Sequence, residues 1–373
     1  MATYKEQNKQ NVPHLRFPEF HGEWEKCKLG DIAEFSTARV SSVKLDCKNY
    51  VSTENMLQDF QGVVEAKSVP NETNVISFTC GDILISNIRP YLKKVWKATF
   101  DGGCSSDVFV LQATDTVAKD YLHYAVANDK FINYVMSGAK GVKMPRGDKN
   151  QMRTYQLSLP SIQEQYKIAK LLTLLDERIA TQSKLIEKLE SLIKGLRVSL
   201  MQIENGNIVH LDEIARIYQP QTISSTELTE EGFLVYGANG IIGKYKQYNH
   251  KTEQICITCR GNTCGMVNYT KPMSWITGNA MVINTDEHQN KVCKRYLYHY
   301  LSAYNFNSII SGSGQPQIVR TPLEQLKVPL PTFLEQKQKA TFLDKIQGKI
   351  EISNKTLNLY LQQKQYLLRQ MFI

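Results

Sequence analysis

The sequence predicts an α/β (α+β) fold: two globular domains separated by two long antiparallel coiled-coil helices, built as a pseudo-twofold internal repeat. Residues 160–201 place apolar side chains at alternating spacings of four and three, which is typical of a heptad coiled coil. Residues 331–373 repeat this stretch at a constant offset of 171. The segment before each long stretch contains short β-like runs bounded by Gly, Asn, Asp and Pro.

The first long stretch predicts a rod of roughly 60 Å, because an α-helix rises 1.5 Å per residue. A narrow apolar stripe on such a rod needs a partner helix, and the second copy supplies one. Further apolar residues outside the stripe, at Leu171, Leu174, Leu185 and Leu192, indicate additional helices from partner proteins. The predicted coiled-coil residues are Ile168, Leu172, Leu175, Ile179, Ile186, Leu189, Ile193, Leu196, Leu343, Ile346, Ile350, Leu357 and Leu367.

The repeat predicts the domain organisation. Each globular half begins with a similar short segment, in which Leu29 and Ile32 match Leu211 and Ile214, and each becomes helical before the long helix. In the second half, Asn239-Gly240 predicts a β-hairpin turn. We expect an N-terminal arm (1–23), a first globular domain (24–160), a first long helix (161–206), a second globular domain (207–331) and a second long helix (332–373).

Composition favours a cytoplasmic globular protein. The 373 residues are 42% hydrophobic and 22% charged, with a net charge of +9. No apolar run reaches the 18 or so residues of a membrane helix, and the first 30 residues hold no apolar signal core. Cys256, Cys259 and Cys264 form a C-x2-C-x4-C cluster, but the run around the first pair reads as a strand, so we expect no metal site.

No catalytic residue and no cofactor bound by this chain is predicted. The sequence lacks a Walker A loop, G-x-S-x-G, H-E-x-x-H and a dinucleotide-binding fingerprint. Both halves instead carry basic, amide-rich and aromatic loops, whose side chains neutralise phosphates and hydrogen-bond to base edges. One such loop can be merely solvated, but loops at matching positions favour DNA binding. The candidates are Ser86, Asn87, Arg89, Tyr91, Lys93, Lys94, Lys140, Lys143, Arg146, Lys149, Arg153, Tyr236, Asn239, Lys244, Lys246, Tyr248, Arg260, Asn262, Thr263, Gln315, Gln317 and Arg320.

Two α/β domains, each followed by Pro-Ser/Thr-x-x-Glu-Gln and a heptad helix, resemble the specificity (S) subunit of type I restriction-modification systems. The resemblance covers nearly the whole chain, most clearly in residues 12–32, 81–91, 101–110 and the repeated motif at 160–165 and 331–336. It implies that the globular domains are target recognition domains, each reading half of a bipartite double-stranded DNA site in the major groove. It also implies that the helices set the gap between the halves.

The resemblance further implies that the subunit is not an enzyme and docks two methyltransferase subunits and two motor-nuclease subunits. S-adenosylmethionine, ATP and Mg²⁺ are then expected on those partners, which methylate a flipped adenine in each half-site. The second helix departs from the first, with Gln347 in place of Asp176 and Lys339 and Lys364 in place of Ile168 and Ile193. A stand-alone or regulatory DNA-binding or scaffold protein of the same architecture, without methyltransferase partners, is the alternative.

Overall fold

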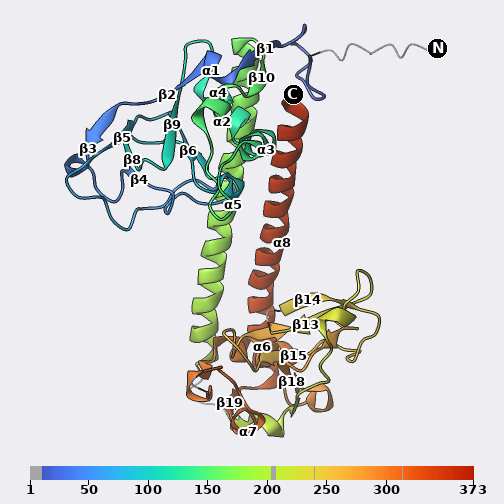
Figure 1. Cartoon of the computed structure of the whole chain (residues 1–373). Coiled ribbons are helices and arrows are strands. Elements are labelled where there is room, and N and C mark those ends of the chain that lie inside the picture. The colour runs from blue at the N-terminus through green and yellow to red at the C-terminus, as the bar shows by residue number, and fades with distance from the viewer. Residues whose placement is uncertain (1–10, 203–206, 239, 313) are drawn as a thin grey trace. The chain divides into compact units, whose positions relative to one another are not determined.

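The described part of the chain, residues 11–202, 207–238, 240–312 and 314–373 of a computed structural model, forms two compact units. Unit 1 comprises the N-terminal part of the chain up to Thr181 together with Leu357–Ile373, and unit 2 comprises Gln182–Thr356. Helices α5 (Ile162–Met201) and α8 (Phe333–Met371) are therefore each divided, with one part in unit 1 and the other part in unit 2 (Figure 1). The predicted α/β class and the two long helices are confirmed.

The globular part of unit 1 contains two sheets, and we call this part, with its flanking short elements, head 1. The first sheet is antiparallel and has the order β2-β9-β6-β7, with β6 (Ile83–Ser86) buried along its whole length. The second has the order β3-β5-β8-β4. The other elements of these sheets are β2 (Ala33–Phe35), β3 (Arg39–Ser41), β4 (Tyr50–Val51), β5 (Asn74–Phe78), β7 (Val95–Lys97), β8 (Gly102–Cys104) and β9 (Val108–Ala113).

Unit 2 repeats this plan in its globular part, head 2. The sheet β12-β18-β15-β16 has the same order and directions as the first sheet of head 1, and β15 (Ile255–Thr258) is the buried counterpart of β6. The second sheet has the order β14-β13-β17. Its elements and the remaining strands are β12 (Arg216–Tyr218), β13 (Phe233–Gly237), β14 (Gly240–Tyr245), β16 (Val267–Tyr269), β17 (Trp275–Ile276) and β18 (Ala280–Asn284).

Helices cover the first sheet of each head and connect it to the long helices. Head 1 has α2 (Lys119–Val126) and α3 (Asp129–Ser137) where one helical segment was expected, because the Asn128 side chain caps a new helix by accepting a hydrogen bond from Phe131 N. Head 2 has α6 (Lys294–Ala303) followed by a 3₁₀ turn. Short helices α1 (Leu29–Ile32), α4 (Lys149–Arg153) and α7 (Arg320–Glu324) complete the set.

A two-stranded ribbon closes each head at the base of its long helix. In unit 1, β1 (Glu25–Lys28) pairs with β10 (Gln156–Leu159). In unit 2, β11 (Asn207–His210) pairs with β19 (Lys327–Leu330). The short polar segment that follows the first long helix is expected to be a loop, but from Asn207 onward it is a strand, because its backbone groups pair with residues more than a hundred positions later. Each ribbon joins the first and last segments of its head.

The glutamine of the repeated motif fastens each head to its long helix. Gln165 is buried, accepts a hydrogen bond from Ala118 N at the start of α2 (2.9 Å) and donates one to Pro160 O (2.9 Å). Gln336 makes the equivalent bonds with Cys293 N at the start of α6 (2.8 Å) and Pro331 O (3.0 Å). Helix N-termini carry unpaired N–H groups, so each glutamine satisfies a donor that would otherwise lack a partner, on the buried Ala118 and on the half-buried Cys293.

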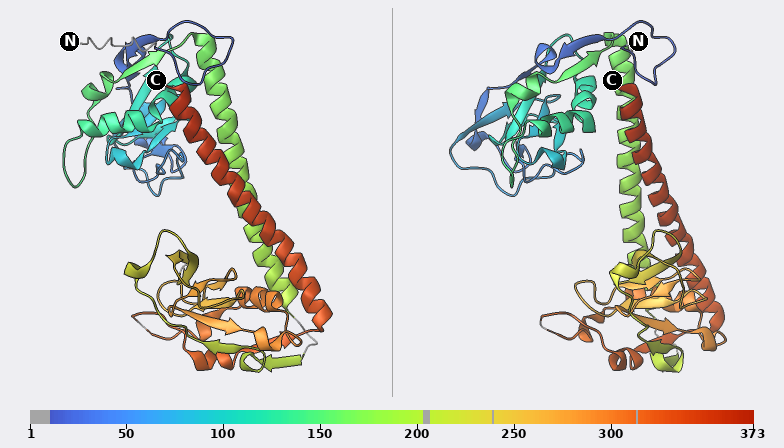
Figure 2. Two further views of the ribbon diagram at one scale, coloured as in Figure 1. Left: turned by 90° about the vertical axis from the view of Figure 1, so that its right-hand side faces the viewer. Right: turned by 45° about the vertical axis from the view of Figure 1, so that its right-hand side comes forward.

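The described part of the N-terminal arm, residues 11–23, packs on unit 1. Arg16 forms a bidentate ion pair with the buried carboxylate of Glu164 (both 2.8 Å), and Leu15 N bonds Gln370 O near the end of α8. Phe372, just beyond α8, stacks on Tyr121 in the core of head 1 at 5.2 Å. Figure 2 shows the red C-terminal end of α8 running beside α5 in unit 1.

The predicted coiled-coil residues are all buried or half-buried, but not all face the other helix. Ile168 and Leu172 belong to the core of head 1, whereas Ile193, Leu343 and Ile350 share a core between the helices of unit 2. The starts of the long helices therefore serve the globular domains as well as the helix pair. Outside the stripe, Leu174, Leu185 and Leu192 stay exposed, as do Phe342, Ile352, Leu359 and Leu361 on α8.

The charged residues that distinguish the two helices meet polar partners. Lys364 pairs with Asp176 (2.6 Å), whose other carboxylate oxygen accepts from the Tyr124 hydroxyl (2.8 Å). Lys339 donates to Leu200 O (2.7 Å) near the C-terminus of α5. A cation at this end of a helix interacts favourably with the helix dipole. The predicted difference between the two helix copies is therefore a set of specific contacts.

Unit 2 has a different polar junction between head and helices, centred on the buried His299. Its Nδ1 accepts from Arg197 Nε (3.1 Å), because an arginine can only donate, so Nε2–H donates to Asp344 (2.9 Å). Arg295 also bonds Asp344. Burial lowers the pKa of His299, so the imidazole is neutral in this arrangement.

Candidate nucleic-acid interface

Two of the predicted basic loops of head 1 lie against each other. The loop after β6 and the loop between α3 and α4 are joined by hydrogen bonds from Arg89 N to Pro145 O (2.8 Å) and from Gly147 N to Asn87 O (3.0 Å). The second loop is closed on itself by reciprocal bonds between Lys140 and Arg146 (3.0 and 2.9 Å). We call residues 86–94 and 139–148 the head 1 loop pair.

The cations of the head 1 loop pair differ in how closely they pair with acidic side chains. Arg89 and Lys143 are exposed, as is Tyr91. Arg146 lies 3.6 Å from Asp107, and Lys140 lies 3.8 Å from Asp148, in pairs that solvent screens. Lys93 is held by Asp129 at 2.8 Å. The exposed cations and the loosely paired ones can turn to an anionic ligand at little cost.

Other predicted residues of head 1 pack into the domain. Lys94 donates to Thr53 O (2.6 Å), and burial lowers its pKa. The ammonium group of Lys149 lies over Phe109 (4.7 Å), and Arg153 lies over Phe35 (5.8 Å). Ser86 is buried and bonds Ile88 O (3.1 Å), while Asn87 contributes the backbone contacts that hold the loop pair together. Arg153 remains exposed, whereas Ser86, Asn87, Lys94 and Lys149 are buried or half-buried and shape the loop pair more than they face solvent.

Head 2 builds the same loop pairing with different side chains. Gly261 N bonds Pro316 O (2.9 Å), Ile318 N bonds Cys259 O (3.0 Å), and Ser311 and Gln317 bond each other reciprocally (2.8 Å each). Residues 259–263 and 311–318, without Ser313, form the head 2 loop pair. Its exposed side chains include Arg260, Asn262, Gln315 and Gln317, whereas the predicted Thr263 is half-buried. Arg320, which follows the loop pair, is exposed and pairs with Glu324 (2.6 Å).

The hairpin β13–β14 brings only part of its predicted residues to the surface. Tyr236 is buried, and its hydroxyl accepts a hydrogen bond from Lys271 N (3.1 Å). Lys244 and Lys246 are exposed, and Tyr248 packs edge-on against Phe233 at 4.9 Å. The turn reaches the head 2 loop pair through hydrogen bonds from Thr258 and Thr263 to Ala238 O. Asn239 lies outside the described residues.

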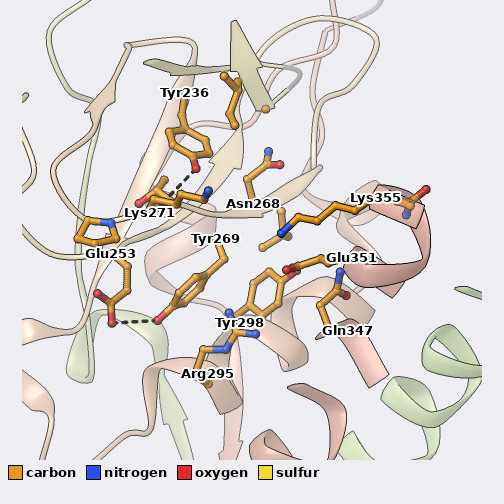
Figure 3. A pocket seen from close by; sticks show the side chains of 16 residues that line it. Tyr236, Glu253, Asn268, Tyr269, Lys271, Arg295, Tyr298, Gln347, Glu351 and Lys355 are labelled. Atoms are coloured by element: carbon orange, nitrogen blue, oxygen red, sulfur yellow. Dashed lines mark hydrogen bonds between the residues drawn. The ribbon is translucent and has the colours of Figure 1, made fainter. Parts of the chain in front are cut away.

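Head 2 also has a cavity of about 740 Å³ where β16 approaches α8 (Figure 3). Arg295 lies over Tyr269 (4.2 Å) and Tyr298 (4.9 Å) on one wall, while Gln347 and Glu351 come from α8 on another. No local sequence motif points to this cavity, because its lining residues come from a strand, a loop and two helices. Its mixed charges select no single class of ligand.

Two further properties bear on the chemistry of the chain. Within the described ranges, no group of three His, Cys, Asp or Glu side chains could hold a metal ion. Burial raises the pKa of the Cys256 thiol to about 12 and also raises that of Cys259, so both stay protonated at neutral pH. None of the described helices is long and apolar enough to span a membrane.

Two aspartates, Asp107 and Asp148, lie beside cations of the head 1 loop pair. Asp107 follows β8 and faces Arg146. Asp148 caps α4 by accepting hydrogen bonds from Asn150 N and Gln151 N, and these bonds lower the pKa of its carboxyl group. The helix-cap pattern of Asp148 is visible in the sequence, but the contact of Asp107 depends on tertiary pairing.

The chain is similar to known proteins in family, sequence and fold. The family model "Type I restriction modification DNA specificity domain" matches residues 21–191 and again residues 204–361. The type I restriction enzyme MjaVIII specificity subunit of Methanocaldococcus jannaschii is 25% identical, over 95% of this chain and 92% of its own. The EcoprrI specificity subunit of Escherichia coli is 32% identical over 36% of this chain and 34% of its own.

Solved structures share the fold at low sequence identity. The S subunit of a type I restriction-modification system from M. genitalium matches with a TM-score of 0.69 and 17% identity, covering 97% of this chain and 99% of that one. A chain from a structure on complex assembly and conformational transition of the type I restriction-modification system has a TM-score of 0.54 and 18% identity, covering 92% and 96%.

Proposed function

The chain belongs to the family of type I restriction-modification DNA specificity domains, and we propose that its two heads, residues 24–160 and 207–331, each read one half of a bipartite DNA target. The family role is recognition of DNA and not catalysis. The observation that carries the proposal is the loop pair, which recurs with the same backbone hydrogen bonds at the same place in both heads.

The side chains of the loop pairs suit contacts with a duplex. Head 1 presents mainly cations, led by Arg89, Lys143 and Arg146, which neutralise phosphates and can also bind guanine. Head 2 presents mainly amides, including Asn262, Gln315 and Gln317, which can make bidentate bonds to adenine in the major groove. The rigid backbone pairing would hold these side chains at fixed positions against base edges.

The long helices would set the gap between half-sites and dock partner subunits. Their packed stripe supports the spacer role, and their exposed apolar side chains, such as Leu185 and Leu192 on α5 and Phe342 on α8, offer surface for further helices. We propose two methyltransferase subunits and two motor-nuclease subunits as partners. These subunits would bring S-adenosylmethionine, ATP and Mg²⁺, which this chain is not proposed to bind.

The test is to express the chain with its methyltransferase partner and sequence the methylated DNA. The expected result is co-purification of the partner and adenine methylation at one bipartite sequence with a constant gap. The alternative, a stand-alone or regulatory DNA-binding or scaffold protein, predicts no methyltransferase partner. Failure to retain a partner, together with DNA binding that shows no bipartite preference, would overturn the main proposal and favour that alternative.

A further inference from the structure

The tip of the head 1 loop pair carries apolar side chains in an otherwise cationic surface. Val142 is 101% exposed and Met144 is 47% exposed, and both flank the exposed Lys143. Lys140 and Arg146 stand at the base of the same loop. Two apolar side chains are thus presented beside Lys140, Lys143 and Arg146, where a solvated loop would favour polar residues.

The backbone holds this tip in place. Gly141 adopts a positive φ of 97°, and a Cβ there would lie 3.2 Å from Met144 O, so the turn favours glycine. The reciprocal Lys140–Arg146 hydrogen bonds close the loop, and the Arg89–Pro145 bond ties it to the neighbouring basic loop. The apolar side chains therefore project from a turn that is tied down at its base.

We infer that Val142 and Met144 contact the C5-methyl group of thymine in the half-site read by head 1. This inference rests on the proposed function. Thymine is the base that presents a methyl group in the major groove, and apolar side chains recognise it there. The surrounding cations supply the attraction to phosphates that brings the tip to the groove.

Among its described residues, the head 2 loop pair has no equivalent of the exposed apolar side chains of Val142 and Met144. At the offset of 171, Gly314 and Gln315 take the places of Lys143 and Met144, and Ser313, in the place of Val142, lies outside the described residues. Thymine-methyl recognition through this loop is therefore assigned to one half-site only.

The test combines a protein variant with a base analogue. The full-length chain is assembled with its methyltransferase partner and titrated with duplexes that carry the bipartite target identified by sequencing methylated DNA. In these duplexes, deoxyuridine replaces thymidine in one half-site at a time. Loss of one buried methyl is expected to weaken binding about three- to fivefold in one half-site. The double variant Val142→Ser, Met144→Ser should bind the thymidine and deoxyuridine duplexes equally. Val43→Ser, at an exposed valine outside the loop pair of head 1, should keep the wild-type ratio.

Two results would overturn the inference while the proposed function stands: preference for the target with no response to deoxyuridine in either half-site, or a double variant that keeps the full ratio. A complex that does not distinguish the bipartite target from a scrambled duplex would instead overturn the proposed function, and the inference with it.

Discussion

At the scale of single residues, Arg146 is the cation whose substitution bears most directly on DNA contact. Its guanidinium lies 3.6 Å from Asp107 in a half-exposed pair, so Arg146→Ala removes a mobile charge without emptying a core. We expect about a tenfold loss of affinity for DNA and a shallower dependence of affinity on salt, because fewer counterions are released. Fluorescence anisotropy across a salt series measures both.

The matched control is Arg39→Ala, which removes an exposed cation of head 1 that bonds Asn74 O outside the loop pair. Its affinity and salt slope should stay at the wild-type values. Equal salt slopes for Arg146→Ala and the wild type would argue against a phosphate contact at Arg146.

His299 predicts a pH dependence of stability in unit 2. Its pKa is lowered by burial, so below pH about 6.5 the unfolded chain binds a proton that the folded chain does not. The contribution of His299 is thus present above that pH and is lost as pH falls, by up to about 1.4 kcal/mol per pH unit.

His299→Gln offers an amide that can accept from Arg197 and donate to Asp344 but does not titrate. Urea unfolding at pH 7 and pH 5 should show a smaller difference for this variant than for the wild type. His123, whose pKa burial lowers to about 4, is present in both proteins and cancels from the comparison. The same pH difference in both proteins would contradict the assigned tautomer and its neutral state.

Single residues also show why the candidate site was only partly predictable. Residue type and position in the sequence located both basic loops of head 1, because cations cluster in each of them. They could not tell that Lys149 packs over Phe109 while Lys143 remains exposed, since that difference depends on which strands lie beneath the loop. The pairing of the two loops likewise depends on hydrogen bonds across more than fifty residues.

At the scale of elements, the repeated glutamine predicts how firmly a head is attached to its helix. Gln165→Leu leaves the Ala118 N–H buried without an acceptor, which costs roughly 1–3 kcal/mol. We expect a corresponding decrease in the free energy of unfolding by urea. Gln163→Leu, at an exposed position in the same helical turn, should change it little. Equal effects of the two variants would show that the buried hydrogen bond is unimportant.

The end of α8 gives a second prediction, because it completes the core of head 1 from the far end of the sequence. Phe372 is buried against Tyr121, so Phe372→Ala should cost about 3–5 kcal/mol. Hydrogen exchange should rise in β6 and β9 while β15 and β18 keep their protection. Ile373→Ala, at an exposed residue, should leave both unchanged. Faster hydrogen exchange in β15 and β18 alone would contradict the prediction, because these strands belong to head 2 and not to head 1.

Periodicity predicted the elements with the strongest local signals and missed those defined by distant pairing. The heptad pattern located both long helices, and short β-like runs bounded by Gly, Asn, Asp and Pro located the buried strands β6 and β15. The ribbon strands β1 and β11 were not predicted. They are four residues long, mostly exposed, and are held by strands more than a hundred residues away. Such strands have no pattern of their own to read.

At the scale of the whole molecule, a change in the length of one long helix must be matched in the other, because the two helices contact each other. Asp176–Lys364 in unit 1 and Lys339–Leu200 in unit 2 fix the register of the pair at separate positions. A heptad inserted into α5 alone would set these contacts seven residues out of step. A test of the spacer proposal therefore needs one heptad between Thr181 and Gln182 and another between Thr356 and Leu357, where the units divide.

The paired insertion should lengthen the helix pair by about 10 Å, since each residue adds 1.5 Å. Duplex DNA rises 3.4 Å per base pair, so the preferred gap should grow by about three base pairs while the bases of each half-site stay the same. Sequencing of methylated DNA from cells expressing the variant with its partner measures both quantities. The single insertion in α5 is the control and should reduce methylation instead of moving the gap. Altered bases with an unchanged gap would refute the spacer role, because the heads and not the helices would then have responded.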